Sequence, residues 1–281
     1  MRQDDVGGDV KMITNEIKQI IKERFKKGNV VTLTGAGISA ESGIPTFRGK
    51  GGLWEKYNPQ TYATPDGLLS VLRARPHDLA HFIVDFYSLL LAASPNPAHL
   101  GLSLLERKGI LKGVITQNID NLHQEAGSRR VIELHGNSYR LCCMGCRHTI
   151  TLEKQRLKEF TSLLHQARNS YYKIMETLSR YFPRCRCGNR YRIDIVFFGE
   201  ALSLDELKKA HQELETCETL LLIGSSFEVY PAASLPLYAK ERGAMLIEIN
   251  EEPSALSDAC DVRIKGKASE VIPSLVKLIE E

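Results

Sequence analysis

The sequence predicts an α/β protein built on a doubly wound, Rossmann-like parallel sheet, with a smaller lobe attached. Three observations support this fold class. Short runs of Val, Ile and Leu alternate along the chain with amphipathic stretches, a pattern typical of strands buried on both faces of a parallel sheet. The first of these runs ends in a glycine turn. Two segments, residues 50–99 and 136–198, interrupt the alternation and are expected to build the smaller lobe.

The first predicted element is a helix over residues 13–25, because its isoleucines and Phe25 recur every three or four positions. Gly28 is a natural end for this helix. Strands are predicted at residues 30–33, 113–116, 131–134, 219–223, 245–249 and 262–265. Helices are predicted at residues 77–92, 100–108, 205–217, 232–242 and 269–280.

These elements suggest a division of the chain into a sheet domain and two insertions. We expect residues 1–49, 100–135 and 199–281 to form the sheet domain. Residues 50–99 would be a helical insertion, and residues 136–198 a cysteine-containing module. Ligands of such sheets bind outside the carboxyl ends of the strands, so we expect the binding site in the cleft between the two lobes.

Five of the seven cysteines lie between positions 142 and 187. Cys143 with Cys146, and Cys185 with Cys187, can each donate two thiolates to one tetrahedral Zn²⁺. Cys142 can take the place of Cys143, and the alternative to a metal site is a set of free thiols. Four thiolates leave no position for water, which predicts a structural zinc. Cys217 and Cys260 stand alone among apolar residues and are expected to be buried.

The segment between the two cysteine pairs, residues 147–184, contains a helical insert. A single helix of about 30 residues would span roughly 45 Å, yet both ends must return to one metal, so we expect a break near Asn169 and Ser170. The apolar residues of this insert form a seam along the predicted helix. This seam packs onto its own module in one interpretation and forms an oligomer contact in the other. Its apolar residues, alternately three and four positions apart, are Leu157, Phe160, Leu164, Ala167, Tyr171, Ile174, Leu178 and Tyr181.

Charge and hydropathy exclude several classes of protein. The net charge of +3, from 37 basic and 34 acidic residues, excludes a histone-like wrapper of nucleic acid. No apolar run is long enough to span a membrane, and residues 1–10 contain three Asp. We therefore expect a cytoplasmic (intracellular) protein without a membrane or nucleic-acid partner. A group of arginines is expected to form a solvated face, with docking of an acidic protein or nucleic acid as the alternative: Arg180, Arg184, Arg186, Arg190 and Arg192.

The glycine turn after residues 30–33 has the form of a phosphate cradle. Gly35 permits a tight turn, and Gly37 allows the backbone to approach a pyrophosphate. The acidic residue that usually follows about 20 positions later and binds a ribose is absent from the expected place. An ordinary turn between a strand and a helix is therefore the alternative.

Three motifs are more specific than this turn. They are the run from Gly35 to Gly49, the run from Thr116 to His123, and His135-Gly136 after a predicted strand. Together they resemble the sirtuin family, the NAD-dependent protein lysine deacylases, from about residue 30 to residue 272. The resemblance implies that the sheet domain binds NAD, and that the cysteines form a zinc ribbon. Here the second cysteine pair is one residue shorter than the common pattern, and the spacer between the pairs is long.

The resemblance also implies roles for single residues. His135 would be the general base, with Asn118 as a second catalytic residue. Taken alone, His135 could be structural, and Asn118 and Asp120 could instead cap a helix that begins near Asn121. His123 would be a wall or structural residue. Those implied to bind NAD are Gly35, Ala36, Gly37, Ile44, Phe47, Arg48, Gln117, Asn118, Ile119, Asp120, Gly224, Ser225, Ser226 and Asn250. Asn250 would take the ribose role of the missing acidic residue.

The substrate implied by the resemblance is an acyl-lysine protein. Ile195, Val196, Phe198 and Gly199 match a loop that pairs with the substrate peptide. Members that prefer succinyl groups carry a Tyr-x-x-Arg pair, whereas this chain has Tyr87 followed by Leu90. Because a carboxylate tail would lack its bidentate partner, we expect a neutral acyl group, acetyl or longer, next to Tyr87.

The implied reaction is transfer of the acyl group from lysine to ADP-ribose, with release of nicotinamide and free lysine. An ADP-ribosyltransferase or NAD glycohydrolase on the same fold is the first alternative. A non-catalytic NAD-binding module is the second, although the presence of Asn118, Asp120 and His135 argues against it. A nicotinamide dehydrogenase would not explain the cysteine module.

Overall fold

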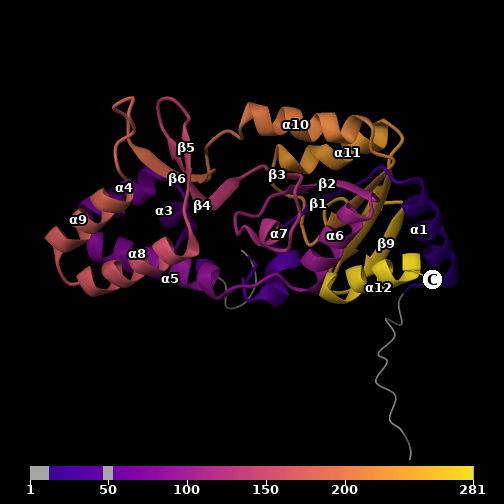
Figure 1. Ribbon diagram of the computed structural model, residues 1–281, viewed down its shortest axis with the longest axis horizontal. Helices are drawn as coiled ribbons and strands as arrows, with labels where there is room; N and C mark the ends of the chain where they lie inside the picture. The colour runs from indigo at the N-terminus through magenta and orange to yellow at the C-terminus, as the bar shows by residue number, and fades with distance from the viewer. Residues whose placement is uncertain (1–12, 47–52, 281) are drawn as a thin grey trace, which may run out of the picture.

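The structure is a computed structural model that describes residues 13–46 and 53–280. Its larger lobe is a parallel sheet with the strand order β3-β2-β1-β7-β8-β9 (Figure 1). The order reverses between β1 and β7, which places a binding crevice at the carboxyl ends of these two strands. The strands are β1 Val30–Thr34, β2 Leu111–Thr116, β3 Val131–Glu133, β7 Thr219–Ile223, β8 Met245–Asn250 and β9 Val262–Lys265.

Helices cover both faces of this sheet. Val30 and Ile247 belong to the core under α1, α6 and α12, whereas Val31 and Leu246 belong to the core under α10 and α11. Successive strand residues therefore point to opposite, equally buried faces. The helices are α1 Asn15–Lys27, α6 Pro97–Arg107, α7 Leu122–Glu125, α10 Leu204–Glu215, α11 Leu235–Glu241 and α12 Ala268–Glu280, with short 3₁₀ helices η1 Ala36–Ser42, η2 Ala232–Ser234 and η3 Ser257–Ala259.

The smaller lobe combines the two insertions, as predicted. Helices from the first insertion pack against a three-stranded sheet of order β5-β4-β6 and two helices from the second. Figure 1 shows this lobe on the left, joined side by side to the larger one. Its elements are α2 Leu53–Lys56, α3 Pro59–Tyr62, α4 Pro65–Ala74, α5 Pro76–Ala92, β4 Gly136–Cys143, β5 Thr149–Thr151, α8 Lys154–Ala167, α9 Tyr171–Tyr181 and β6 Tyr191–Ile195.

The helical insert folds back on itself at the predicted place. α8 ends at Ala167 and α9 begins at Tyr171, so the break falls on residues 168–170. Phe160 and Ile174 of the seam are buried in one core with Tyr87 of α5. The seam therefore packs within its own lobe, which favours the first of the two interpretations over an oligomer contact.

All six predicted strands of the main sheet are present, with ends that differ by up to two residues from the predicted ones. The small sheet and the short helices α2, α3 and α4 were not predicted. The glycine turn leads into the 3₁₀ helix η1 instead of an α-helix. Among the described residues, no helix has the length and apolar character needed to cross a membrane.

Candidate active site and metal centre

A cavity of about 1590 Å³ lies between the two lobes, at the carboxyl ends of the parallel strands. Its volume exceeds the about 300–1,000 Å³ of typical small-molecule sites, so it has room for more than one ligand. The segments after β1, β2, β7 and β8 supply a polar wall. Of the residues that sequence analysis singled out, those that line the cavity are Gly35, Ala36, Gly37, Tyr87, Gln117, Asn118, Ile119, His135, Ile195, Val196, Phe198, Gly199, Gly224, Ser225, Ser226 and Asn250.

The glycine turn packs directly against the segment after β7. Gly35 N donates to the Ile223 carbonyl oxygen (2.9 Å), and Gly37 N donates to the Gly224 carbonyl oxygen (2.8 Å). A Cβ atom on Gly37 would lie 2.7 Å from Gly224 Cα, closer than any real contact. The glycines are thus needed for the approach of two backbone segments, in addition to any approach of a ligand.

Behind the wall, a buried network joins the end of β2 to η1. Asn118 Nδ2 donates to the carbonyl oxygen of Gly35 (3.0 Å) and to Ser39 Oγ (3.2 Å), and Ser39 Oγ donates to Asp120 Oδ2 (2.7 Å). The Asn118 amide nitrogen therefore points inward, which leaves its carbonyl oxygen as the free acceptor. Sequence analysis missed Ser39, whose hydroxyl links the two polar residues.

Asp120 lies behind the cavity wall and is not part of the lining. Its Oδ1 atom accepts from the backbone N–H of Leu122 (3.0 Å), the first residue of α7. The capping role that the sequence offered for Asn118 and Asp120 is therefore met by Asp120, whereas Asn118 bonds to Gly35 and Ser39. Burial raises the pKa of this carboxyl, although the hydrogen bonds from Leu122 and Ser39 lower it in part.

His135 follows β3, and its ring is fixed by the backbone of the neighbouring segment. Nδ1 lies 2.8 Å from the Gln117 carbonyl oxygen. Because that oxygen can only accept, Nδ1 carries the proton and Nε2 is the basic nitrogen. Burial lowers the pKa of His135, with an opposing, smaller effect of the Gln117 carbonyl. The imidazole is therefore neutral at pH 7 and suited to accept a proton.

His123 and His99 lie deeper, in contact with one another. Their ring centroids are 5.0 Å apart, and both side chains are buried. His123 Nε2 lies 3.0 Å from Thr34 Oγ1, and burial lowers its pKa well below the usual value. His123 does not line the cavity, so the structure favours the structural role among the two that the sequence left open.

At the far end of the polar wall, Ser225 and Asn250 come together from β7 and β8. Asn250 Nδ2 donates to the Ser225 carbonyl oxygen (2.9 Å), and Ser225 Oγ accepts from Gln117 Nε2 (3.0 Å). The cavity wall is thus held together across three strand ends. Ile44 lies apart from it and packs against the small-lobe core, whereas Phe47 and Arg48 lie outside the described residues.

The segment expected to pair with a peptide crosses between the lobes after β6. Val196 N donates to the His135 carbonyl oxygen (2.9 Å), which ties the segment to the proposed base. Phe198 is exposed to solvent, with a relative exposure of 53% for the residue. Arg192 pairs with Glu200 (2.5 Å), whose other carboxylate oxygen accepts from Phe197 N. Arg192 is therefore half-buried and not on the solvated arginine face.

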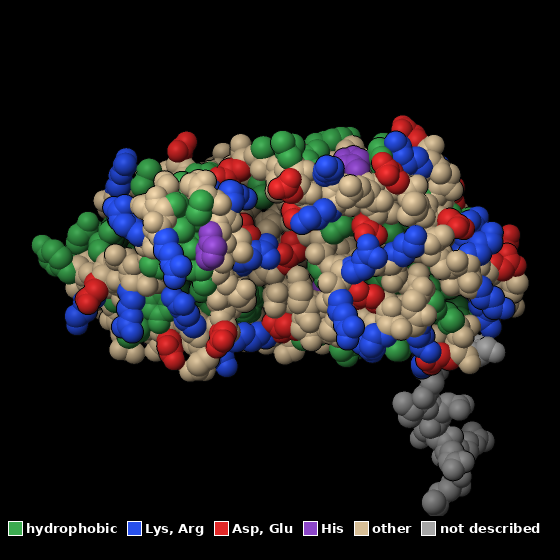
Figure 2. All heavy atoms as spheres, turned by 45° about the horizontal axis from the view of Figure 1, so that its top comes forward, with side chains coloured by type: hydrophobic (Ala, Val, Ile, Leu, Met, Phe, Trp, Pro, Cys, Tyr) green, Lys and Arg blue, Asp and Glu red, His purple; other side chains and the backbone are tan. Residues whose placement is uncertain are grey.

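The other arginines of that group are exposed, at positions 180, 184, 186 and 190. Figure 2 shows Lys and Arg side chains spread over the visible face of the small lobe. The structure thus agrees with the solvated face expected from the sequence for these four residues.

The other end of the cavity is an apolar arm inside the small lobe. It is formed by α4, α5 and α9, and sequence analysis missed it because its residues look like ordinary helical core. Tyr87 is fully buried there and donates its hydroxyl to the Ser138 carbonyl oxygen (3.1 Å). Leu90, which stands where the succinyl-preferring pair has its arginine, lies in the small-lobe core and not in the cavity lining. The arm residues are Leu68, Leu72, Leu79, Phe82, Ile83, Phe86, Met175, Leu178 and Phe182.

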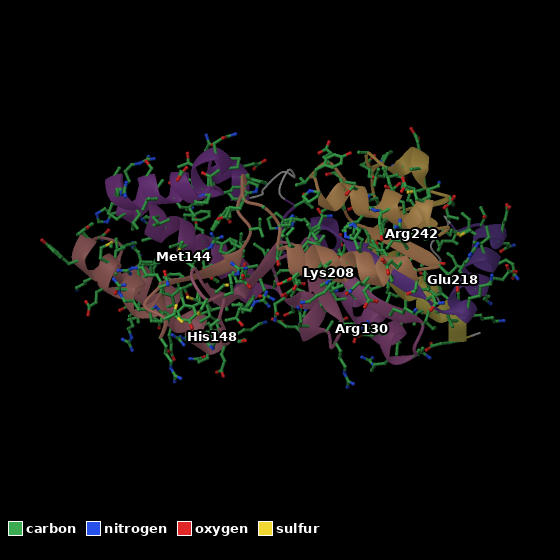
Figure 3. All side chains as sticks on the ribbon, turned by 90° about the horizontal axis from the view of Figure 1, so that it is seen from above. Arg130, Met144, His148, Lys208, Glu218 and Arg242 are labelled. Atoms are coloured by element: carbon green, nitrogen blue, oxygen red, sulfur yellow. The ribbon has the colours of Figure 1, made fainter. Side chains whose placement is uncertain are left out.

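Four cysteines converge at the outer end of the small sheet. The sulfur atoms of Cys143, Cys146, Cys185 and Cys187 all lie within 4.8 Å of one another. Cys143 to Cys187 is 3.4 Å and Cys146 to Cys185 is 3.6 Å, close to the about 3.8 Å between thiolates bound tetrahedrally at 2.3 Å. The four sulfurs therefore fit one Zn²⁺, and in Figure 3 sulfur atoms gather between the labelled Met144 and His148.

The structure also decides between Cys142 and Cys143. They are adjacent in β4, so their side chains point to opposite faces. Cys143 joins the cluster, whereas the Cys142 thiol lies against the backbone oxygens of Cys143 and Arg147. The Cys187 backbone N–H, followed by the Tyr191 hydroxyl, lowers the pKa of Cys185.

Comparison with known proteins identifies the family. The model of the Sir2 family matches residues 35–231. An NAD-dependent protein deacylase of Pyrococcus furiosus is 44% identical over 262 residues, covering 93% of this chain and 97% of its own. A crystal structure of a Sir2 homologue in complex with NAD has a TM-score of 0.75 at 38% identity, with 93% of both chains covered. A Sir2 protein bound to a myristoylated histone peptide has a TM-score of 0.68 at 35% identity, covering 95% of this chain and 98% of its own. The chain therefore belongs to the Sir2 family.

Proposed function

We propose that this chain is an NAD-dependent protein deacylase that removes neutral acyl groups, acetyl or longer, from lysine side chains. One observation carries the proposal. His135, whose Nε2 atom is basic, lines a single cavity. One end of this cavity is polar and fits a dinucleotide, and the other end is apolar and fits an acyl chain. The family and the deacylase relatives support the same activity.

We assign the polar end to NAD. The backbone of Gly35, Ala36 and Gly37 would face the phosphates, with Gly224, Ser225, Ser226 and Asn250 on the adenosine side. The free amide oxygen of Asn118 would accept from the carboxamide of nicotinamide, and Gln117 and Ile119 would complete that pocket. Asp120 would act through Ser39 and Asn118, because it lies behind the wall. Phe47 and Arg48 keep their sequence-based assignment to the same pocket, and Ile44, which packs on the small-lobe core, is assigned to it from the sequence alone.

NAD, when bound, supplies an electrophilic ribose carbon and carries the acyl group away. The task of this chain is to hold the reacting groups together and to move one proton. His135 Nε2 would accept that proton from a ribose hydroxyl while its Nδ1–H stays on the Gln117 carbonyl oxygen, so that the ring does not need to reorient. The resulting imidazolium would later return the proton.

We assign the segment containing Ile195, Val196, Phe198 and Gly199 to the peptide, and Tyr87 to the acyl site. Ile83 and Phe86 of α5 line the apolar arm, and Leu90 stands on the same helix where the succinyl-preferring pair would place an arginine. The arm is lined by apolar residues from three helices, α4, α5 and α9, and a Sir2 neighbour is described as bound to a myristoylated histone peptide. We therefore expect long acyl chains to be accepted together with acetyl.

The four cysteines would hold a structural zinc that stabilises the small lobe. Cys143 and Cys185 tether β4 to the segment before β6, on both sides of the insert. We also propose the domain boundaries given by the sequence, with residues 1–49, 100–135 and 199–281 as the NAD-binding domain and residues 50–99 and 136–198 as the two insertions.

The main alternative is ADP-ribosyl transfer or simple cleavage of NAD. It would be favoured if the insert blocked entry of a peptide. However, α8 and α9 pack against α5 within their own lobe, and the exposed Phe198 side chain supports an open path. Incubation with NAD and an acetyl-lysine peptide tests the two. Loss of the acetyl group supports deacylation, whereas ADP-ribose added to a protein supports the alternative.

A further inference from the structure

A carboxylate is buried in β8, two residues before Asn250. The side chain of Glu248 is 3% exposed and stands in a row with Leu246 and Asn250 on one face of the strand. Central strands of a parallel sheet are normally apolar, and an ionised group in such a place is costly unless it is bonded. The bonds that Glu248 makes therefore indicate why it is there.

Both oxygens of Glu248 are engaged. Oε2 accepts from Ser257 Oγ (2.5 Å) and lies 3.4 Å from Nε of Arg263, its cross-strand neighbour in β9. Oε1 accepts from Asn250 Nδ2 (3.3 Å). Ser257 Oγ in turn accepts from Ser254 N (2.8 Å), so that the carboxylate is anchored to the turn between β8 and β9. Glu248 is thus fixed from one side and holds Asn250 on the other.

The consequence for Asn250 is a defined amide orientation. Its Nδ2 lies between two groups that can only accept, Glu248 Oε1 at 3.3 Å and the Ser225 carbonyl oxygen at 2.9 Å. The nitrogen must therefore point inward, and Oδ1 is left as the free group of a residue that lines the cavity. At this point the wall accepts hydrogen bonds and offers none from the Asn250 side chain.

We propose that Glu248 is a positioning residue that makes this wall specific for unmodified ribose hydroxyls and excludes a 2′-phosphate. The inference rests on the proposed binding of NAD. A ribose hydroxyl donates to Asn250 Oδ1, whereas phosphate oxygens would face an acceptor with a carboxylate directly behind it, which is an unfavourable contact between like charges. Glu248 thereby fills, through Asn250, the role of the acidic ribose ligand that the glycine turn lacks downstream.

Two other carboxylates, Glu251 and Glu252, follow Asn250 and also line the cavity. They are exposed, and Glu252 lies 3.5 Å from Lys265 with 80% of its side chain in solvent. The negative field of these two carboxylates would repel a 2′-phosphate even without a fixed orientation of the Asn250 amide. The experiment must therefore separate a general negative field from the fixed orientation of Asn250.

The test is calorimetric titration of the full chain with ADP-ribose and with its 2′-phosphate, in the absence of peptide. We expect the wild type to bind ADP-ribose at least about tenfold more tightly than the 2′-phosphate. Glu248→Met removes the acceptor, so the Kd for ADP-ribose should rise roughly three- to tenfold and the preference between the two ligands should narrow. Glu248→Gln keeps an acceptor for Asn250 and should retain most of the ADP-ribose affinity.

Two further variants decide the interpretation. Glu252→Gln should change the preference for ADP-ribose over its 2′-phosphate less than Glu248→Met does. An equal change in both variants would show that the general negative field, and not the orientation of Asn250, sets this preference. If Glu248→Met does not fold, Ser257→Ala should produce a smaller change of the same sign. An unaltered preference in a folded Glu248→Met or Ser257→Ala variant would overturn the inference. A wild type that binds neither ligand would instead contradict the proposed function, and equal binding of both would contradict only the role of Glu248.

Discussion

Nδ1 of His135 lies 2.8 Å from the carbonyl oxygen of Gln117. This one contact fixes the tautomer, because a carbonyl oxygen can only accept, and it leaves Nε2 as the base at the wall of the cavity. The peptide segment is anchored to the same residue, since Val196 N donates to the His135 carbonyl oxygen. The proposed base is thus held by the NAD side and the peptide side of the cavity at once.

The first prediction concerns the loss of this base. His135→Ala should lower kcat by roughly 10²–10⁴-fold, the usual range for a general base, while the Kd for NAD changes little. Steady-state kinetics and calorimetry measure the two quantities. His165→Ala, which removes an exposed histidine of α8, is the matched control and should behave as the wild type. Loss of NAD binding together with activity would show that His135 shapes the pocket instead.

The second prediction is the position of the acidic limb of the pH profile. Burial lowers the pKa of His135 below its ordinary value of 6.5, so the neutral, active form persists at pH 6.5 and is lost only at lower pH. We therefore expect the midpoint of the acidic limb of kcat/KM to lie below pH 6.5. Circular dichroism should show a folded chain throughout. An acidic limb centred above pH 6.5 in a folded chain would contradict this assignment.

The third prediction distinguishes two neighbouring cysteines. Cys143→Ser should lose the bound zinc and lower the melting temperature, because three thiolates remain where four are needed. Cys142→Ser should keep about one zinc per chain, since its sulfur lies outside the cluster. Elemental analysis of the purified variants measures this directly. Zinc retained by the first variant and lost by the second would reverse the assignment of the ligands.

The fourth prediction concerns the apolar arm. Leu178→Arg in α9 places a charge in the arm and should raise KM for a fatty-acyl peptide at least about tenfold, because each buried methylene contributes about 0.8 kcal/mol. Hydrolysis of an acetyl peptide should change less than about threefold. Leu163→Arg, on the exposed side of the same insert, is the control. Equal effects on both peptides, or a succinyl peptide as the best substrate of the wild type, would contradict the neutral-acyl assignment.

The main sheet could be predicted because its strands are uninterrupted Val, Ile and Leu runs, as in Leu220, Leu221 and Leu222 of β7. The small sheet could not, since β4 buries the polar Asn137 and Ser138, whose side chains mask any apolar pattern. Three ligands of the metal site, Cys146, Cys185 and Cys187, followed from cysteine spacing alone. The choice between Cys142 and Cys143 required the strand geometry that puts neighbouring side chains on opposite faces.

Residues that act through others were the hardest to find from the sequence. Ser39 reads as one small residue of a turn, and only the fold brings it within 2.7 Å of Asp120, 81 positions away. Glu248 reads as an interruption of a buried strand, and its role depends on Ser225 and Ser257 from separate segments. The apolar arm was missed for the same reason, because Ile83 and Leu178 come from different insertions and meet only in the folded lobe.

The most direct test of the account is mass spectrometry of the products formed from NAD and an acyl-lysine peptide. The account predicts a peptide lighter by one acyl group, together with nicotinamide and an O-acyl-ADP-ribose, in equal amounts. Nicotinamide released while the peptide keeps its acyl group would contradict it and would indicate that the cavity cleaves NAD or transfers ADP-ribose instead.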